Sequence, residues 1–408
     1  MRSPVVSALR WFDFARAAWM YLRGGEGCLD QFRAEFAASL GMPAESVWLF
    51  GSGRAALHAL VAALALKAGD EVLLPGYTCV VVPNVFMHLG LGVRYVDIEA
   101  GGFNPTAEAI AAAISAATRV VVVPHNFGLI TTGLTQLRAR FPGIVFIEDA
   151  AHAWGAREGA GGAFAGTLGQ GGFYSFEYSK CLSTGLGGAL LIGDEALRRR
   201  FVAPALQRPR GGALARQALT LAWHRLVAAL PGPALAALQV LLRLPSRALG
   251  LVAQTPASEL SGASRPNYAQ GLHPLAAALG LCQLRRAARL WALRDAQARR
   301  YDEVFAGSSR FERPARAAGA VLLRYPLRLR QPAERAALMA ELKALGIMAD
   351  CWFDDVVHPR GSLRHGYTAG QCPVGEAAAE AVINLPLGLH AQLSAAQWRG
   401  LRRLAGRA

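Results

Sequence analysis

Residues 172–188 read Gly-Phe-Tyr-Ser-Phe-Glu-Tyr-Ser-Lys-Cys-Leu-Ser-Thr-Gly-Leu-Gly-Gly, with Lys180 in a run of aromatic and small residues. Lysines are very scarce in the chain, and arginine supplies nearly all of its positive charge. A lysine at this position therefore suggests a need for a nucleophilic amine, which arginine cannot provide. An ordinary surface lysine is the alternative.

A second segment, residues 147–152, reads Ile-Glu-Asp-Ala-Ala-His. Asp149 ends an apolar run there, so its carboxylate is largely removed from water and needs a cationic partner. The N–H of a pyridinium ring would supply that partner, and an arginine in a structural ion pair is the alternative. His152 could contact the face or the 3-hydroxyl of such a ring, or it could be a surface histidine.

A third segment, residues 50–57, reads Phe-Gly-Ser-Gly-Arg-Ala-Ala-Leu and joins a strand to a helix. Its glycines allow an anion to approach the backbone, and the helix N-terminus offers free N–H groups. A plain tight turn explains this segment equally well when it is taken alone. A lysine, a strand-end aspartate and such a turn together suit pyridoxal 5′-phosphate, with Ser175 or Ser179 as a further phosphate contact.

Seven short apolar runs alternate with helical patterns between about residues 46 and 193. The alternation predicts an α/β protein with a mostly parallel seven-stranded sheet and helices on both faces. Ligands bind such sheets at the carboxyl ends of the strands, where Ser52, Asp149 and Lys180 fall. The predicted strands are Val47–Phe50, Val72–Leu74, Val93–Val96, Val120–Val123, Ile144–Glu148, Phe173–Phe176 and Ala189–Ile192, with predicted helices that include Ala55–Leu66 and Ala107–Ala116.

The composition changes along the chain and predicts four parts. We expect an N-terminal helical segment (1–45), a large cofactor-binding domain (46–200), a basic apolar insert (201–262) and a C-terminal part (263–408) that ends in a smaller α+β domain. The pattern of the last part predicts helices over Gln283–Tyr301 and Glu334–Leu345, and strands over Leu322–Leu329 and Ala381–Leu385.

The insert combines positive charge with apolar sequence. No Asp or Glu occurs from Ala196 to Ser258, while arginines are frequent there. Residues 226–242 are apolar apart from one glutamine, and Pro231-Gly232-Pro233 divides them, which predicts two short helices. Each piece is shorter than the ~20 apolar residues that span a bilayer. The insert could cap the domain, extend a dimer interface or lie on an anionic membrane.

Composition limits the class of protein and the kinds of partner that remain possible. The chain has 408 residues, 53% of them hydrophobic, and a formal net charge of +15, so it is a folded protein that favours acidic partners unless the charge reflects genome composition. No nucleic-acid-binding motif is present, and the six scattered cysteines form no CxxC pair, so we expect neither a nucleic-acid partner nor a metal site. The first residues lack a signal-peptide pattern and predict an amphipathic helix docked on the protein rather than on a membrane.

The motifs taken together resemble the DegT-type sugar aminotransferases, a branch of the fold type I pyridoxal phosphate enzymes. The resemblance covers nearly the whole chain. It rests on the three segments above and on residues 69–78, 96–98, 124–128, 265–268, 278–284, 346–347, 358–359, 372–376 and 384–386, which follow in the family's order.

The resemblance implies a role for each candidate residue. Lys180 is expected to be the Schiff-base lysine, Asp149 the partner of the ring nitrogen and His152 a residue beside the ring. Asn267 is expected to reach the phosphate of a neighbouring subunit, which implies a homodimer whose subunits exchange a crossing segment. The phosphate site is expected to contain Ser52, Gly53, Arg54 and Ser175, and the substrate contacts to include His125, Arg265 and His358.

Three positions depart from the family's pattern. Arg54 stands where threonine is common, Cys79 stands where an aromatic residue is common, and Leu186 replaces a common glutamate. An ionic phosphate contact by Arg54 is then expected, and stacking on the cofactor ring passes to Tyr77. These departures suggest an unusual acceptor or location.

The expected function is transfer of an amino group, from glutamate, to a keto-sugar that is linked to a nucleotide. The resemblance connects such sugars with polysaccharide, lipopolysaccharide or secondary-metabolite biosynthesis. We expect a cytoplasmic protein, with peripheral contact to the inner face of the cell membrane through residues 201–260 as an option. The alternatives are an aminotransferase for a non-sugar ketone, a sugar dehydratase (a branch in which histidine replaces the lysine) and a non-catalytic, membrane-associated relative.

Overall fold

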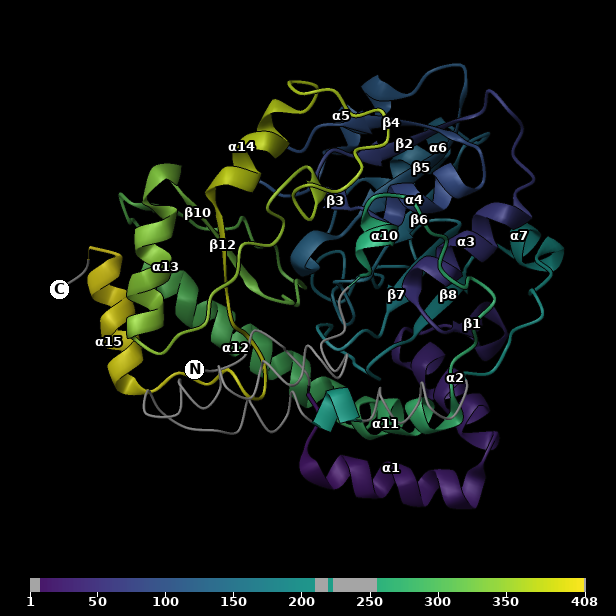
Figure 1. Cartoon of the computed structure of the whole chain (residues 1–408), viewed down its shortest axis with the longest axis horizontal. Coiled ribbons are helices and arrows are strands. Elements are labelled where there is room, and N and C mark those ends of the chain that lie inside the picture. The colour runs from purple at the N-terminus through teal and green to yellow at the C-terminus, as the bar shows by residue number, and fades with distance from the viewer. Residues whose placement is uncertain (1–7, 210–218, 223–254, 407–408) are drawn as a thin grey trace.

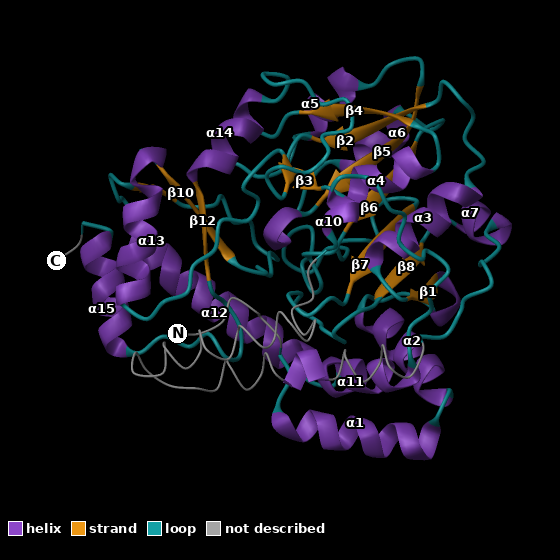
Figure 2. Ribbon diagram, in the orientation of Figure 1, coloured by secondary structure: helices purple, strands orange, loops and turns teal. Residues whose placement is uncertain are grey.

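The computed structural model of the chain describes residues 8–209, 219–222 and 255–406. Its larger part is built on a seven-stranded sheet, and its smaller part on a three-stranded sheet (Figures 1 and 2). The two short helices predicted within residues 226–242 lie outside the described residues. Among the described helices, none combines the length and the hydropathy needed to cross a bilayer.

The large sheet has the predicted seven strands. In spatial order they are β1 (Val47–Phe50), β8 (Gly188–Ile192), β7 (Gly171–Ser175), β6 (Val145–Asp149), β5 (Thr118–Pro124), β2 (Glu71–Pro75) and β4 (Gly92–Val96). Strand β8 runs antiparallel to both of its neighbours, and the remaining pairs are parallel. The prediction of a mostly parallel sheet is therefore confirmed, and the ends of β1, β6 and β7 lie at one edge.

Helices cover both faces of this sheet, as predicted. Alternate side chains of one strand enter different cores, because successive residues point to opposite faces. Val72 and Leu74 of β2 pack in the core of α3 and α4, while Leu73 packs in the core of α5 and α6. The helices of this part are α2 (Gly27–Ser39), α3 (Gly53–Ala63), α4 (Val81–His88), α5 (Ala107–Ala113), α6 (Leu134–Arg140) and α7 (Glu195–Arg200), with 3-10 turns at Ala44–Ser46 and Asn126–Gly128.

The smaller part is an α+β unit with its own core. Its antiparallel sheet has the order β12 (Val382–Leu385), β10 (Tyr325–Leu329) and β9 (Phe311–Glu312). Four helices pack around it: α12 (Ala287–Phe305), α13 (Arg335–Ala344), α14 (Pro373–Ala381) and α15 (Ala395–Leu404), with a 3-10 turn at Pro332–Glu334. A two-stranded parallel pair, β3 (Thr78–Cys79) with β11 (Val357–His358), joins the smaller part to the large sheet.

The N-terminal segment folds onto the protein. Helix α1 (Trp11–Gly24) packs on α11 (Pro274–Leu284), which also contacts α2, and α1 forms the lower edge of the molecule in Figure 1. Asp13 is buried on the inner side of α1, where Arg286 donates hydrogen bonds of 2.9 and 2.7 Å to its two carboxylate oxygens. The predicted docked amphipathic helix is thus present.

Most predicted elements differ from the structure by a few residues at their ends, and two of them differ in ways that have a clear cause. The helix predicted over Gln283–Tyr301 is interrupted at Arg285 and Arg286, between α11 and α12. The side chain of Gln283 bonds both backbone polar groups of Ser183, at 3.1 and 2.6 Å, which holds the end of α11 under the loop after β7.

The strand predicted over Leu322–Leu329 begins at Tyr325 instead. The reason is that the carbonyls of Leu322 and Leu323 accept hydrogen bonds from the guanidinium of Arg294, rather than from a neighbouring strand.

Candidate active site

The turn after β1 lies against the ends of two other strands. Ser52 caps α3, since its Oγ accepts a hydrogen bond from the Ala55 N–H at 3.2 Å. A Cβ on Gly53 would lie 3.0 Å from the Tyr174 carbonyl oxygen and 3.2 Å from Cβ of Ser175. A Cβ on Gly188 would overlap the backbone of the same turn. The glycines thus allow Ser52, Ser175 and the free N–H groups of α3 to converge, which suits a phosphate.

Lys180 occupies a closed turn immediately after β7. Its N–H donates to the Glu177 carbonyl at 2.9 Å, and the carboxylate of Glu177 accepts hydrogen bonds from the N–H and hydroxyl of Ser179. The lysine is buried, at 9% exposure. Burial lowers the pKa of its amine, although the nearby Glu177, Cys79 and Asp149 oppose this. A larger share of unprotonated amine favours nucleophilic attack.

Asp149 ends β6, one strand away from the lysine turn. Its Oδ1 accepts a hydrogen bond from the Ala151 N–H at 3.0 Å. Burial raises the pKa of the carboxyl, while the Ala151 N–H and the positive charge of Lys180 act in the opposite direction. A half-buried carboxylate at a strand end favours a further cation beside it.

His152 lies three residues beyond and is buried at 6% exposure. Burial, followed by the charges of Lys180 and Arg324, holds the pKa of its imidazole well below the usual range, so the ring is neutral. Its Nδ1 accepts a hydrogen bond from the Phe127 N–H at 3.2 Å, which places the ring proton on Nε2. His152 can therefore donate one hydrogen bond and present an apolar face.

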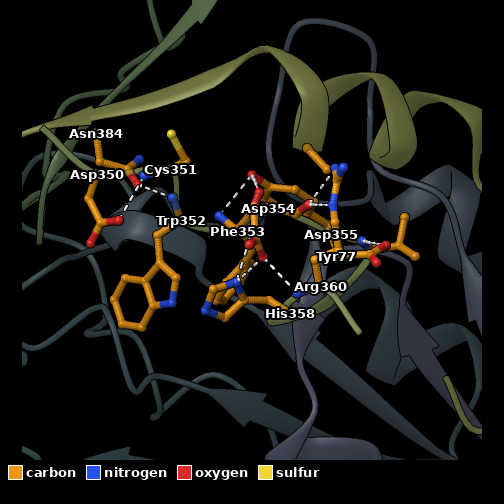
Figure 3. A network of polar contacts seen from close by, with 12 residues as sticks. Tyr77, Asp350, Cys351, Trp352, Phe353, Asp354, Asp355, His358, Arg360 and Asn384 are labelled. Atoms are coloured by element: carbon orange, nitrogen blue, oxygen red, sulfur yellow. Dashed lines mark hydrogen bonds and ion pairs between the residues drawn. The ribbon is translucent and has the colours of Figure 1, made fainter. Parts of the chain in front are cut away.

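Trp352 is a site residue that the sequence did not indicate. Its ring centroid lies 4.6 Å from Nζ of Lys180, 5.0 Å from the His152 ring and 4.3 Å from the guanidinium carbon of Arg324. The backbone N–H of Trp352 donates a hydrogen bond of 2.6 Å to Oδ1 of Asn384, as the dashed line in Figure 3 shows. Stacking on the cofactor ring was expected from Tyr77, and Trp352 lies far from it in the sequence.

Arg324 is a second such residue. It is buried at 5% exposure and its Nη1 donates to Asp350 at 2.7 Å, while its Nε has no hydrogen-bond partner among the described residues. Its position directly before β10 gave no sequence signal, because arginines are frequent throughout this chain.

Tyr77 does not face this site. Its side chain is fully buried, and its hydroxyl donates to the Phe353 carbonyl at 3.0 Å and accepts from the Phe353 N–H at 3.1 Å (Figure 3). Its ring packs against Phe103, Phe127 and Phe353. Tyr77 therefore lies at the junction of the two parts. This position does not fit the predicted stacking of Tyr77 on the cofactor ring.

His125 also lies within the protein rather than at an open surface. It is 1% exposed, its Nδ1 accepts from the Thr131 N–H at 3.1 Å, and its Nε2 donates to Glu148 at 2.7 Å. Glu148 in turn accepts hydrogen bonds of 2.6 Å from the N–H groups of Gly166, Leu168 and Gly169. With both ring nitrogens used, His125 does not fit the predicted contact with a substrate.

Arg54 is tied to a residue at the end of the insert. Its Nη1 lies 2.7 Å from Oε1 of Glu259, which belongs to α10 (Ala257–Leu260) and is 3% exposed. Burial raises the pKa of Glu259, although Arg54 opposes this shift. The ionic phosphate contact predicted for Arg54 therefore competes with a carboxylate of the same chain.

Asn267 and Arg265 are exposed on a segment that crosses α3 and α4. Tyr268 fixes that segment, since its ring stacks on His58 with centroids 4.0 Å apart and its hydroxyl bonds Nδ1 of His88 at 2.8 Å. Asn267 donates to the side chain of Gln207 at 3.2 Å. Both side chains are exposed, and their contact with a second subunit stays a prediction.

His358 lies beside the site on β11. Its Nδ1 bonds Oδ1 of Asp354 at 2.6 Å, and its ring packs on Phe353 and Trp352 (Figure 3). Strand β11 pairs His358 with Cys79 of β3, a half-buried thiol whose pKa is raised by burial. His358 therefore borders the site from the smaller part, where a substrate contact is feasible.

The residues gathered here fit pyridoxal 5′-phosphate. The turn at Ser52 is a glycine-lined cradle for the phosphate, Asp149 is a half-buried carboxylate at a strand end, and Lys180 offers a buried amine between them. His152 adds a neutral donor next to the lysine. The sequence predicted each of these positions.

Similar proteins of known activity match parts of the chain. A dTDP-4-dehydro-2,3,6-trideoxy-D-glucose 4-aminotransferase of Saccharopolyspora spinosa is 36% identical over 172 residues, 41% of this chain and 44% of that protein. An L-glutamine:2-deoxy-scyllo-inosose aminotransferase of Streptomyces kanamyceticus is 38% identical over 152 residues, 37% of this chain and 35% of that protein. The chain thus matches about half or less of the length of these relatives.

Solved structures match nearly the whole chain. The aminotransferase TlmJ from Streptoalloteichus hindustanus superposes with a TM-score of 0.73 at 24% identity, covering 99% of this chain and 97% of that one. The PLP-form of Spr1654 from Streptococcus pneumoniae, a protein described as a sugar aminotransferase, gives 0.73 at 20% identity, covering 99% and 98%. These likenesses confirm the fold type I architecture.

The model of the DegT/DnrJ/EryC1/StrS aminotransferase family matches residues 13–215 and 247–398, which is most of the chain. The match spans the turn at Ser52, Asp149 and Lys180, the positions at which the site was built above. The fold, the site and this match agree with one another, and the chain belongs to the DegT/DnrJ/EryC1/StrS aminotransferase family, whose cofactor is pyridoxal 5′-phosphate.

Proposed function

We propose that this protein is a pyridoxal 5′-phosphate-dependent aminotransferase that aminates a ketone of a sugar or a sugar-like ring. The observation that carries the proposal is a buried lysine, Lys180, whose pKa is lowered and whose amine lies at the strand edge that also holds Asp149 and the Ser52 turn. A retained lysine of this kind argues against the dehydratase branch, in which histidine replaces it.

Each residue has a role in that reaction. Pyridoxal 5′-phosphate supplies an aldehyde that reacts with amines and a ring that takes up negative charge when a proton is removed beside the nitrogen. Asp149 would keep the ring nitrogen protonated, because a half-buried carboxylate favours a cationic N–H partner. Lys180 would hold the aldehyde at rest, and its amine, once freed by the amino donor, would remove and return the proton of the reacting carbon atoms as a general base and acid. His152 and Trp352 restrict access of water.

The amino donor is proposed to be glutamate or glutamine, and Arg324 to bind its carboxylate. The guanidinium lies on the Trp352 ring, which also contacts Lys180, and its Nε has no hydrogen-bond partner within residues 8–209, 219–222 and 255–406. Guanidinium groups bind carboxylates with two parallel hydrogen bonds, which makes arginine suited to this task. The Streptomyces kanamyceticus relative is named for glutamine as its donor, which supports a donor of this size.

The acceptor is proposed to be a keto-sugar linked to a nucleotide. The relative from Saccharopolyspora spinosa, named for a dTDP-linked substrate, supports this choice, and the net charge of +15 favours an acceptor that carries phosphate. The cyclitol named for the Streptomyces kanamyceticus relative is the second candidate, because it lacks a nucleotide. Polysaccharide, lipopolysaccharide or secondary-metabolite biosynthesis would consume either product.

The site is proposed to be completed in a cytoplasmic homodimer. The exposed Asn267, on a segment fixed by Tyr268, supports a contact with a partner's phosphate site, and Arg265 and His358 are proposed as further substrate contacts. The basic insert, residues 201–260, is proposed to touch either the dimer partner or an anionic membrane.

Separate half-reactions test the function. Purified protein loaded with the cofactor is mixed with glutamate or glutamine, and the absorbance of the cofactor is followed. A panel of dTDP-linked 4-keto-sugars and 2-deoxy-scyllo-inosose is then added, and the aminated product is identified by mass spectrometry. We expect conversion of one acceptor and none with Lys180→Ala. Failure of both half-reactions in protein that retains the cofactor would refute the aminotransferase proposal.

A further inference from the structure

The outer face of α1 carries large apolar side chains in contact with solvent. Phe12 is 86% exposed, Leu22 82%, Trp19 56% and Trp11 45%. In a helix with 3.6 residues per turn, the spacing of these residues puts them on one side, with Ala15 and Ala18 between them. Four large apolar side chains gathered on one exposed face of a single helix mark an interaction surface.

The inner face of the same helix is fixed to the protein. Asp13 and Ala17 are buried there, and Asp13 forms its paired hydrogen bonds with Arg286. Asp13 also accepts a hydrogen bond from the Arg10 N–H at 2.7 Å, which begins the helix. The exposed face is therefore held in one orientation rather than presented by a free tail.

The charges around this face have one sign. Arg16 and Arg23 border the apolar residues and are exposed, and the guanidinium of Arg23 lies 4.7 Å from the centroid of the Trp19 ring. The one acidic residue within α1 points inward. The acids that follow α1 are compensated, since Glu26 lies 3.1 Å from Arg208 and Asp30 lies 3.0 Å from Arg33.

We propose that the outer face of α1 docks on an anionic phospholipid bilayer. A helix with aromatic and aliphatic side chains on one face and arginines beside them lies in the plane of a membrane, with its apolar face at the boundary of headgroups and acyl chains. Tryptophan is enriched at this depth. The arginines bind lipid phosphates, so the charge of the face matches an anionic surface.

The position of α1 favours a partner with a flat surface. The helix lies along an edge of the molecule, where its outer side is accessible along its length (Figure 1). A second copy of the chain would bring the same arginines together and place like charges opposite each other, which is unfavourable. A bilayer accepts both the apolar residues and the arginines of a single helix.

Flotation with lipid vesicles tests the proposal. The full chain, loaded with cofactor, is mixed with vesicles of phosphatidylcholine alone or with phosphatidylglycerol, at low and high salt. We expect binding to the anionic vesicles that salt weakens, and a loss on the order of tenfold or more in the double variant Phe12→Ser/Leu22→Ser. The matched control, Leu363→Ser, removes an exposed apolar side chain outside both α1 and the basic insert and is expected to bind like the parent protein.

Further variants distinguish membrane binding by α1 from binding by the insert and from contact with a second copy of the chain. Arg16→Glu/Arg23→Glu should weaken binding to anionic vesicles and leave thermal unfolding unchanged, which controls for misfolding. A version with residues 211–250 replaced by a short linker should still respond to Phe12→Ser/Leu22→Ser. The proposal is overturned if the parent does not float, or if Phe12→Ser/Leu22→Ser floats like the parent. A fall in molar mass by light scattering in Phe12→Ser/Leu22→Ser also overturns it, and assigns the face to a second copy.

Discussion

The amine of Lys180 and the guanidinium of Arg324 pack on one ring, that of Trp352, at 4.6 and 4.3 Å from its centre. An aromatic face attracts cations and excludes water from them. The ring thus contacts two positive groups at once, and the charge of Arg324 adds to burial in lowering the pKa of Lys180. This relationship predicts how the reaction depends on pH.

Replacing Trp352 with alanine should move the acid limb of the pH–rate profile to higher pH. Burial lowers the pKa of Lys180, and the lysine must be unprotonated to react. Admitting water raises this pKa toward its ordinary value, so less free amine is present at a given pH. Trp352→Phe, which keeps a ring, should shift the limb less. An unchanged profile in Trp352→Ala would show that the ring does not control the lysine.

Arg324→Ala should weaken binding of the amino donor more than binding of the acceptor. We expect KM for glutamate or glutamine to rise on the order of 10- to 100-fold, equivalent to about 1.4–2.8 kcal/mol of transition-state binding, with a smaller change for the acceptor. Arg330→Ala is a matched control, because this arginine follows the same strand and pairs with Glu312 on the surface. Equal effects on both substrates would contradict a carboxylate contact.

Asp149→Asn should slow turnover on the order of 10³-fold or more, equivalent to roughly 4 kcal/mol of barrier, because the ring nitrogen loses its proton. Activity within about tenfold of the parent would show that Asp149 is structural.

Thermal unfolding of the Asp149→Asn variant gives a second test, which does not depend on catalysis. The folded pKa of Asp149 is raised, so ionisation of this group costs stability as pH rises through its unfolded and then its folded pKa. The cofactor-free variant should therefore melt at a higher temperature than the cofactor-free parent at neutral pH, with the difference vanishing in acid. The cofactor should stabilise the variant less.

Lys180 should be the residue that borohydride links to the cofactor. Reduction of the loaded protein, followed by digestion and mass spectrometry, is expected to give a stable adduct on the peptide that contains Lys180, and none in Lys180→Ala. Of the other lysines, Lys67 is the natural internal control in the same digest. An adduct on Lys67 alone would contradict the site.

Asn267 should act in a neighbouring subunit. Mixing the inactive variants Lys180→Ala and Asn267→Ala is expected to restore activity, because hybrid dimers contain one site with both native residues. Mixing Lys180→Ala with Asp149→Asn, whose changes lie in the same subunit's part of the site, should not restore activity. A monomer by light scattering at micromolar concentration would rule out the shared site.

The sequence predicted the large sheet because its strands are short, apolar and separated by helical patterns, so local pattern was sufficient. It predicted Ser52, Asp149 and Lys180 because each follows directly from a strand end. It did not reveal the roles of Tyr77 and Arg54, since their partners, Phe353 and Glu259, lie far away in the chain. Side chains that face one another across two parts of the fold leave no periodic signal in either segment.

Adjacent carboxylates on β6 have separate tasks. Glu148 points to one side of the strand and accepts four hydrogen bonds, and Asp149 points to the other side, toward the lysine. Since consecutive residues of a strand face opposite ways, the network around Glu148 immobilises the backbone of its neighbour without touching the chemistry. The carboxylate of Asp149 is thus in place before any ligand arrives, so ordering it adds no free-energy cost to ligand binding.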